Sequence, residues 1–261
     1  MKEKIETFST LLKDFEYRYD LRAVFNDFLT LTLCACCQNP LTGLSHDEDL
    51  YLQTIEPYKT DSLRHHFPKL FVRLTCEMED RVGSDTGNDV LGEFYEQNLY
   101  RKGAAQYFTP YPICTFIARA TTGYIDANIA RDPLRILDPC CGSGRMLLAS
   151  AQANGKDHEF YGIDIDPTCV KMTAINLFLN GMFHSEVMCG DALDPNDFRG
   201  SYKISFLPFG IFRVTEKQNS WLYLLHKNSF QNNQAKTQKP ELLFRSALGE
   251  KVIIGTQLKF F

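Results

Sequence analysis

The first 88 residues carry apolar side chains at the spacing of helices. One stretch with this spacing ends at Asn39-Pro40 and contains Leu21, Val24, Phe25, Phe28, Leu29 and Leu31. A second stretch runs from Leu63 to Arg81 and has one apolar face; we interpret its lysines and arginines as the solvated face. The polar, turn-prone residues 83–88 then mark a boundary. We therefore predict a helical region over residues 1–88.

After residue 89 the pattern changes to an alternation of helices and short apolar strands. Two short helices are expected first, over Val90–Tyr100 and Ile113–Tyr124. The expected strands are Arg135–Asp138, Glu159–Asp164, Glu186–Cys189 and Tyr202–Leu207. Helices fit between these strands, notably over Arg145–Ala153 and Pro167–Asn180. This alternation predicts an α/β fold over residues 89–212, with a doubly wound, mostly parallel sheet covered on both faces.

The remainder, residues 213–261, is expected to be a tail. It is polar and irregular from Thr215 until the apolar run Lys251–Ile254. Because so little chain follows the fourth expected strand, we predict that the sheet is shortened or is completed by a strand over Lys251–Phe261.

Composition and charge narrow the classes of function. The 261 residues carry a formal net charge of −4, so a nucleic-acid partner would require a local basic face. No apolar run reaches the roughly 18–20 residues of a membrane span, and the first residues are polar; we expect no membrane association and a cytoplasmic location. Among the 9 cysteines only Cys34 and Cys37 have the Cys-x-x-Cys spacing, and they lie with Cys36 in an apolar stretch; we therefore interpret the cysteines as buried side chains and predict no metal site.

The strongest chemical signal is the turn Asp138-Pro139-Cys140-Cys141-Gly142-Ser143-Gly144, placed where a strand runs into a helix. Gly142 and Gly144 let the backbone turn tightly and approach a ligand. A dinucleotide fingerprint would need a third glycine, but Leu147 stands there. The carboxylate of Asp138 would repel a pyrophosphate and suits an ammonium group better. The turn therefore disfavours a nicotinamide-dependent dehydrogenase.

Two further carboxylates follow the next two strands. Asp164 lies about 20 residues beyond the turn, the distance at which an acidic residue reaches ribose hydroxyls in nucleotide-binding sheets. Asp191 follows the third strand in Gly190-Asp191. Asp166 precedes Pro167 and is expected to be the N-cap of the next helix. We expect the carboxylates of Asp138, Asp164 and Asp191 to share one crevice at the strand ends.

These motifs resemble those of the γ-type adenine-N6 DNA methyltransferases, and most of all the M (modification) subunits of type I restriction–modification systems. The residues that match the family's cofactor motifs are Gln106, Tyr107, Phe108, Thr109, Pro110, Asp138, Gly142, Ser143, Gly144, Asp164 and Asp191. The resemblance implies a Rossmann-like core that binds S-adenosylmethionine (AdoMet). It also implies methyl transfer to the exocyclic amine of adenine in DNA, with a specificity subunit or another protein as a further partner.

The chain departs from that family at the catalytic motif (Asp/Asn)-Pro-Pro-(Phe/Tyr). The matching residues are Phe206, Leu207, Pro208 and Phe209. Leu207, Pro208 and Phe209 keep a carbonyl, a proline and a ring to stack on adenine, but Phe206 replaces the hydrogen-bond acceptor. Losing one oriented acceptor costs about 100- to 1,000-fold in rate. Two hypotheses follow: an active or weakly active adenine-N6 DNA methyltransferase, or a non-catalytic, AdoMet-binding protein associated with DNA.

The last residues carry a separate hypothesis. Gln257, Leu258, Phe260 and Phe261 resemble the peptide with which bacterial proteins dock into the sliding clamp of DNA replication. The alternative is that Val252–Phe261 is a closing strand.

Overall fold

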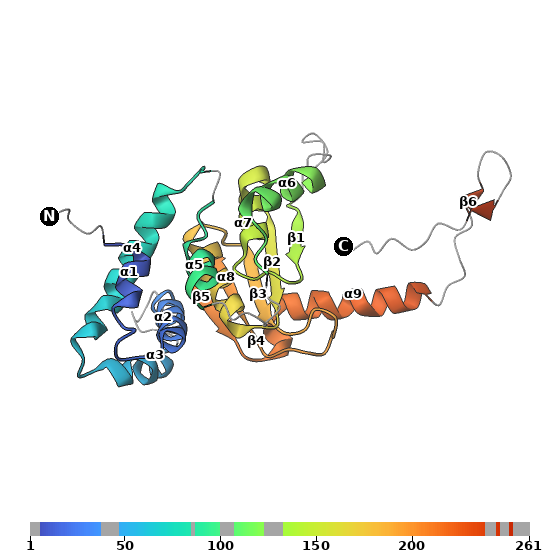
Figure 1. Cartoon of the computed structure of the whole chain (residues 1–261). Coiled ribbons are helices and arrows are strands. Elements are labelled where there is room, and N and C mark those ends of the chain that lie inside the picture. Colours follow the sequence, from blue (N-terminus) through green and yellow to red (C-terminus); the bar gives the residue numbers. More distant parts are fainter. Residues whose placement is uncertain are drawn as a thin grey trace.

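The structure is a computed structural model that describes residues 6–37, 47–84, 87–99, 107–122, 133–237, 244–245 and 251–252 (Figure 1). Gln106 and the segment Gln257–Phe261 lie outside these described residues, so the predictions made for them stay predictions.

The N-terminal part of the chain is helical, as predicted. Its helices are α1 (Phe8–Lys13), α2 (Leu21–Ala35), α3 (Glu48–Ile55) and α4 (His66–Asp80). The N-cap Asp20 begins α2, because its carboxylate accepts a hydrogen bond from the backbone N–H of Ala23 at 2.9 Å. Helix α4 buries Phe67, Leu70, Leu74 and Met78, the apolar face that the sequence pattern predicts.

The centre of the molecule is a sheet of 5 strands in the order β1-β2-β3-β4-β5. The strands are β1 (Arg135–Asp138), β2 (Glu159–Asp164), β3 (Ser185–Cys189), β4 (Gly200–Phe206) and β5 (Phe209–Val214). Strands β1, β2 and β3 are parallel, whereas β4 is antiparallel to β3 and β5 is antiparallel to β4. The fold is thus α/β with a mixed sheet, and the predicted class is confirmed.

Strand β4 departs from the mostly parallel arrangement that the sequence predicts. Cys189 at the end of β3 pairs with Gly200 at the start of β4. The reason lies in the connection over residues 190–199, which contains no helix. A parallel pair needs a crossover of a dozen or more residues, usually helical, whereas an antiparallel pair does not. The order of the described strands also does not reverse, so β1 is an edge strand and the sheet is not doubly wound.

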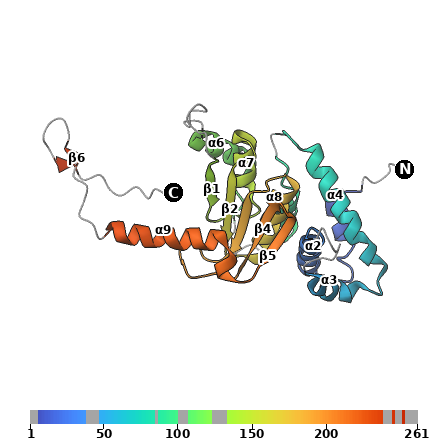
Figure 2. The ribbon, with the colours of Figure 1, turned by 180° about the vertical axis from the view of Figure 1, so that it is seen from behind.

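One face of the sheet is covered by the crossover helices and the N-terminal region. Helices α7 (Arg145–Asn154) and α8 (Pro167–Leu179) connect the parallel strands, and α2 packs on α8 (Figure 2). A single hydrophobic cluster reaches from Phe8 in α1 to Ile211 in β5. The helical region and the sheet therefore share one core, and the predicted division at residue 88 stays a prediction. Helices α5 (Val90–Phe94) and α6 (Tyr111–Thr122) lie between these parts in the sequence.

The other face carries helix α9 (Trp221–Thr237), where the sequence predicts an irregular polar tail; that prediction is wrong. Leu222 and Tyr223 pack against Tyr161, Ile163 and Met188. Both views show α9 extending past β1 (Figures 1 and 2). Tertiary contacts explain the error, because the buried carboxylate of Glu186 accepts from the Leu222 N–H at 3.1 Å and so fixes the start of α9.

The chain after α9 does not complete the sheet within the described residues. Strand β6 (Phe244–Arg245) pairs with β7 (Lys251–Val252) in a separate two-stranded sheet. No helix in the described part of the chain combines the length and the apolarity that crossing a bilayer would require.

Candidate functional site

The glycine turn after β1 is held against the end of β2. The backbone N–H of Cys141 donates to the Ile163 carbonyl at 2.9 Å, and the N–H of Gly142 donates to Asp164 Oδ2 at 2.8 Å. Gly142 and Gly144 have φ angles of 55° and 88°, in the left-handed region that favours glycine. The turn therefore places backbone groups at the carboxyl edge of the parallel strands, where ligands bind in open α/β sheets.

Asp138 lies close enough to Asp164 for the charge of Asp164 to influence its ionisation. Burial raises the pKa of Asp138, the hydrogen bond from the Cys140 N–H opposes this, and the charge of Asp164 raises the pKa further. Burial also raises the pKa of Asp164, although its oxygens accept from the N–H groups of Gly142 and Asp166. Two crowded carboxylates favour a positively charged ligand between or beside them.

The third predicted carboxylate follows β3 at the same edge. The N–H of Gly190 donates to the Asp164 carbonyl at 3.0 Å, which places the Gly190-Asp191 segment beside the end of β2. Asp191 Oδ1 accepts from the Leu193 N–H at 2.8 Å. A Cβ at Gly190 would lie 2.3 Å from the Asp197 carbonyl oxygen, so this close turn requires glycine. The structure thus brings Asp138, Asp164 and Asp191 to one edge of the sheet.

Phe108 is the member of the Gln106–Pro110 motif that contacts the glycine turn. Its ring lies 3.3 Å from the position that a Cβ at Gly142 would occupy. Tyr107 is 88% exposed, and Thr109 and Pro110 are exposed at the start of α6. Phe108 is therefore the described motif residue best placed to shape the turn.

Ser143 has a role that the sequence does not reveal. Its hydroxyl is buried and donates to Asp89 Oδ2 at 2.5 Å, so the side chain is turned away from the crevice. Asp89 also accepts from Arg145 Nε at 2.6 Å and from Asn176 Nδ2 at 2.8 Å. It accepts from the Gly92 N–H as well, as the N-cap of α5. The N-cap pattern before Val90 was the signal available for Asp89, but its other partners are distant in sequence.

The predicted catalytic residues Leu207, Pro208 and Phe209 lie at the opposite edge of the sheet. Strand β4 is antiparallel to β3, so it begins with Gly200 at the carboxyl edge and runs away from that edge. Phe206 is six residues further along and therefore lies roughly 20 Å from the carboxyl edge. Phe206 and Phe209 instead pack their rings against Phe183, at centroid distances of 5.5 and 5.4 Å. The structure does not bring these residues together with the three carboxylates, which corrects the expected arrangement.

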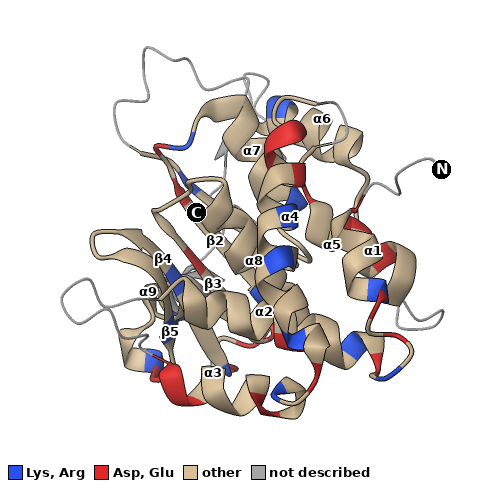
Figure 3. Ribbon diagram, turned by 90° about the vertical axis from the view of Figure 1, so that its left-hand side faces the viewer, with Lys and Arg blue, Asp and Glu red and all other residues tan. Residues whose placement is uncertain are grey.

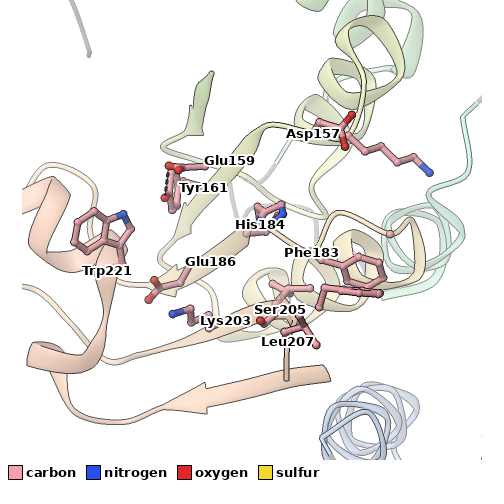
Figure 4. A pocket seen from close by; sticks show the side chains of 15 residues that line it. Asp157, Glu159, Tyr161, Phe183, His184, Glu186, Lys203, Ser205, Leu207 and Trp221 are labelled. Atoms are coloured by element: carbon pink, nitrogen blue, oxygen red, sulfur yellow. Dashed lines mark hydrogen bonds between the residues drawn. The ribbon is translucent and has the colours of Figure 1, made fainter. Parts of the chain in front are cut away.

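A cavity of about 610 Å3 adjoins this opposite edge (Figure 4). Its lining includes Glu159, Tyr161, Lys203, Leu207 and Trp221. The Tyr161 hydroxyl donates to Glu159 at 2.9 Å. The buried carboxylate of Glu186, also in the lining, accepts from the hydroxyls of Ser201 and Ser220, both at 2.6 Å. These contacts attach α9 to the sheet, and none of the three carboxylates at the carboxyl edge lines the cavity.

Charges of both signs are mixed over the surface. Figure 3 shows segments of Lys and Arg interspersed with segments of Asp and Glu on the helices. Arginines are partly neutralised by ion pairs, for example Arg213 with Asp47 at 2.7 Å and Arg81 with Glu93 at 2.6 Å. This view therefore does not show the local basic face that a nucleic-acid partner would require.

Comparisons with known proteins give related enzymes. A segment of 106 residues is 30% identical to the type I restriction enzyme HindI methylase subunit of Haemophilus influenzae, and it covers 36% of this chain and 22% of that relative. The chain thus spans about a fifth of the length of this curated relative.

Two solved structures are similar in part. One is a putative class I S-adenosylmethionine-dependent methyltransferase from Listeria monocytogenes, with a TM-score of 0.41, 14% identity, and coverage of 72% of this chain and 53% of that chain. The other is the type I restriction-modification system methyltransferase subunit from Streptococcus thermophilus, with a TM-score of 0.37, 13% identity, and coverage of 85% and 69%.

The match that covers most of the sheet is to a family model. The model of N-6 DNA methylases matches residues 86–236, from the segment around Asp89 to the end of α9. This is more than half of the chain, and the chain therefore belongs to the N-6 DNA methylase family.

Proposed function

We propose that this chain binds AdoMet at the carboxyl edge of β1, β2 and β3. The family match confirms the resemblance from which AdoMet was expected. The observation that carries the proposal is the glycine turn, in which Gly142 and Gly144 have positive φ angles and the Gly142 N–H donates to Asp164. AdoMet carries a sulfonium and an ammonium group, and it supplies a transferable methyl group when bound.

The residues at this edge fit such a ligand. Burial raises the pKa values of Asp138 and Asp164, and a neighbouring carboxylate raises each further: Asp164 acts on Asp138, and Asp166 acts on Asp164. A cation beside them is therefore favoured. Each carboxylate oxygen that accepts one backbone hydrogen bond keeps a further lone pair. Asp164 would hold the ribose hydroxyls, Asp191 the adenine side, and Asp138 the methionine end, with Gly142 and Gly144 close to the ligand.

The transfer step has less support from this chain's own residues. Phe206 offers no acceptor for an amine proton, and the whole segment Phe206–Phe209 lies at the far edge of the sheet. We therefore favour the non-catalytic hypothesis: an AdoMet-binding protein associated with DNA modification, in which another polypeptide supplies transfer and target recognition. A weakly active adenine methyltransferase is the second candidate, supported by the family match.

The deciding experiment incubates the whole chain with radiolabelled AdoMet and adenine-containing DNA. We expect AdoMet to bind and DNA to remain unlabelled. Phe206→Asn recreates one letter of the family's motif, but we expect no gain of transfer because the residue is remote from the site. Methylation by the wild type at ordinary enzyme rates would overturn the non-catalytic proposal, and absence of AdoMet binding would overturn the site itself.

The remaining assignments are proposals of the same kind. We infer DNA and a specificity subunit or another protein as partners, and the end of the chain as a clamp-docking peptide. Deleting Gln257–Phe261 should then abolish binding to a sliding clamp and leave AdoMet affinity unchanged. Loss of folding on that deletion would favour the closing strand instead.

A further inference from the structure

Arg145 lies beneath the glycine turn and contacts three groups from an earlier part of the chain. Its Nε donates to Asp89 Oδ2 at 2.6 Å and its terminal nitrogen donates to Glu96 Oε2 at 3.1 Å. Its guanidinium carbon also lies 5.4 Å from the centroid of the Phe108 ring. One side chain thus links the first residue of α7 to Phe108 and to the segment over residues 89–96.

The position of this arginine is electrostatically costly. Arg145 follows Gly144 directly and is the first residue of α7, where the helix dipole disfavours a cation. It is also 8% exposed, and burying a guanidinium is costly unless it is paired. Asp89 and Glu96 provide that pairing. A cation at an unfavourable position, paired with two carboxylates, indicates that Arg145 has a specific structural or functional role.

The geometry indicates what this role is. Phe108 is half-buried and lies near three groups in this region. They are the guanidinium of Arg145, the ring of Tyr95 at 5.8 Å, and Gly142, where an added Cβ would lie 3.3 Å from the Phe108 ring. A guanidinium attracts the face of an aromatic ring, and because it is planar it stacks there better than an ammonium group. Arg145 directly follows Gly144, the last residue of the glycine turn, so its side chain can keep the ring in register with Gly142.

We infer that Arg145 is a positioning residue that holds Phe108 against the glycine turn, so that affinity for AdoMet depends on a side chain buried beneath the site. This inference rests on the proposed function for the ligand. The position of Phe108 in the ligand-free chain does not depend on the proposed function, so the role of Arg145 can be tested separately.

The first measurement is hydrogen exchange at the amides of Tyr107, Phe108 and Thr109 in the ligand-free full chain. Arg145→Met should increase their exchange rates, and Arg145→Lys should restore them in part because it keeps the charge but not the planar group. The matched control is Arg81→Met, which removes an arginine–carboxylate pair with α5 but has no contact with Phe108. Unchanged exchange in both Arg145 variants would overturn the inference, whether or not the protein binds AdoMet.

The second measurement is a double-mutant cycle on AdoMet affinity. Arg145→Met and Phe108→Leu should each weaken binding by roughly 3- to 30-fold, the range expected from loss of a cation–π contact. The double variant should be little weaker than either single variant, because both remove the same contact. Additive losses would overturn the inference, as would a lower melting temperature with unchanged affinity.

A third pair of variants covers the case in which Arg145→Met does not fold. Phe108→Leu leaves all hydrogen-bond donors of Asp89 in place, and Arg145→Lys keeps a positive charge near Asp89. The effects of these two variants on AdoMet affinity should be coupled in the same way, with a smaller magnitude. If the wild type itself binds no AdoMet, the proposed function fails, and the exchange measurement alone decides the role of Arg145.

Discussion

The two edges of the sheet differ in the side chains that they present. At the carboxyl edge, Asp138 and Asp164 accept backbone hydrogen bonds from Cys140, Gly142 and Asp166. At the opposite edge, the matching motif residues Phe206 and Leu207 are apolar and are 56% and 84% exposed. The comparison shows that a motif's position along the chain does not place it in a site; the direction of its strand does.

The largest expected effect separates the two edges directly. Asp164→Ala removes a carboxylate that holds the glycine turn and, in the proposed site, the ribose. A hydrogen bond to a charged group contributes about 1.5–3 kcal/mol, so AdoMet affinity should fall by roughly 10- to 150-fold in calorimetric titration. Phe209→Ala at the other edge is the control and should change affinity less than about twofold. Equal losses in the two variants would remove the distinction between the edges.

The second prediction concerns the structural role of the opposite edge. Glu186→Gln replaces a buried carboxylate that accepts from Ser201, Ser220 and the Leu222 N–H. The amide nitrogen that replaces one carboxylate oxygen cannot accept, so at least one of these bonds is lost and the free energy of unfolding should fall by about 1–3 kcal/mol in urea denaturation. AdoMet affinity, measured under conditions in which the variant is folded, should equal that of the wild type. A selective loss of AdoMet binding would show that this face belongs to the site.

The smallest expected effect concerns Asp138, whose charge lowers the stability of the folded chain and is expected to favour AdoMet binding. Burial raises the pKa of Asp138 in the folded chain, so the folded state binds a proton more tightly than the unfolded state. The contribution of Asp138 to stability therefore falls as the pH rises from 3.8, the ordinary pKa of this carboxyl, through its raised pKa in the folded chain. Asp138→Asn keeps an oxygen for the Cys140 N–H, and it should abolish that pH dependence without lowering the melting temperature at pH 7.

The same variant should weaken AdoMet binding by several-fold to about tenfold, because a charge facing the ligand's cation is lost. For the wild type, affinity should fall as the pH is lowered through the raised pKa values of Asp138 and Asp164. Titrations across acidic pH with and without the substitution measure both effects. A melting temperature that falls sharply at pH 7 would contradict the account of Asp138 as a destabilising charge.

Local sequence was sufficient for the elements that depend on neighbouring residues. The spans of β1 and β2 were predicted from short apolar runs, and the Asp166-Pro167 start of α8 is confirmed by the bond from the Thr168 N–H to Asp166 at 2.8 Å. Caps, turns and the glycine φ angles are set within a few residues, so a sequence pattern contains them. The positions of Asp138, Asp164 and Asp191 at one edge follow from three parallel strands.

The tertiary structure decided what depends on residues far apart. The antiparallel pairing of β4 moved Phe209 to the opposite edge, and contacts of Glu186 with the start of α9 turned an apparently irregular tail into a helix. The bond from Arg145 to Asp89 spans 56 positions and placed Ser143 in the interior. Such pairings are chosen by the free energy of burying the whole set of groups together. The sequence alone therefore determined which residues are suited to bind AdoMet, and only the folded chain decided which of its motifs stands beside them.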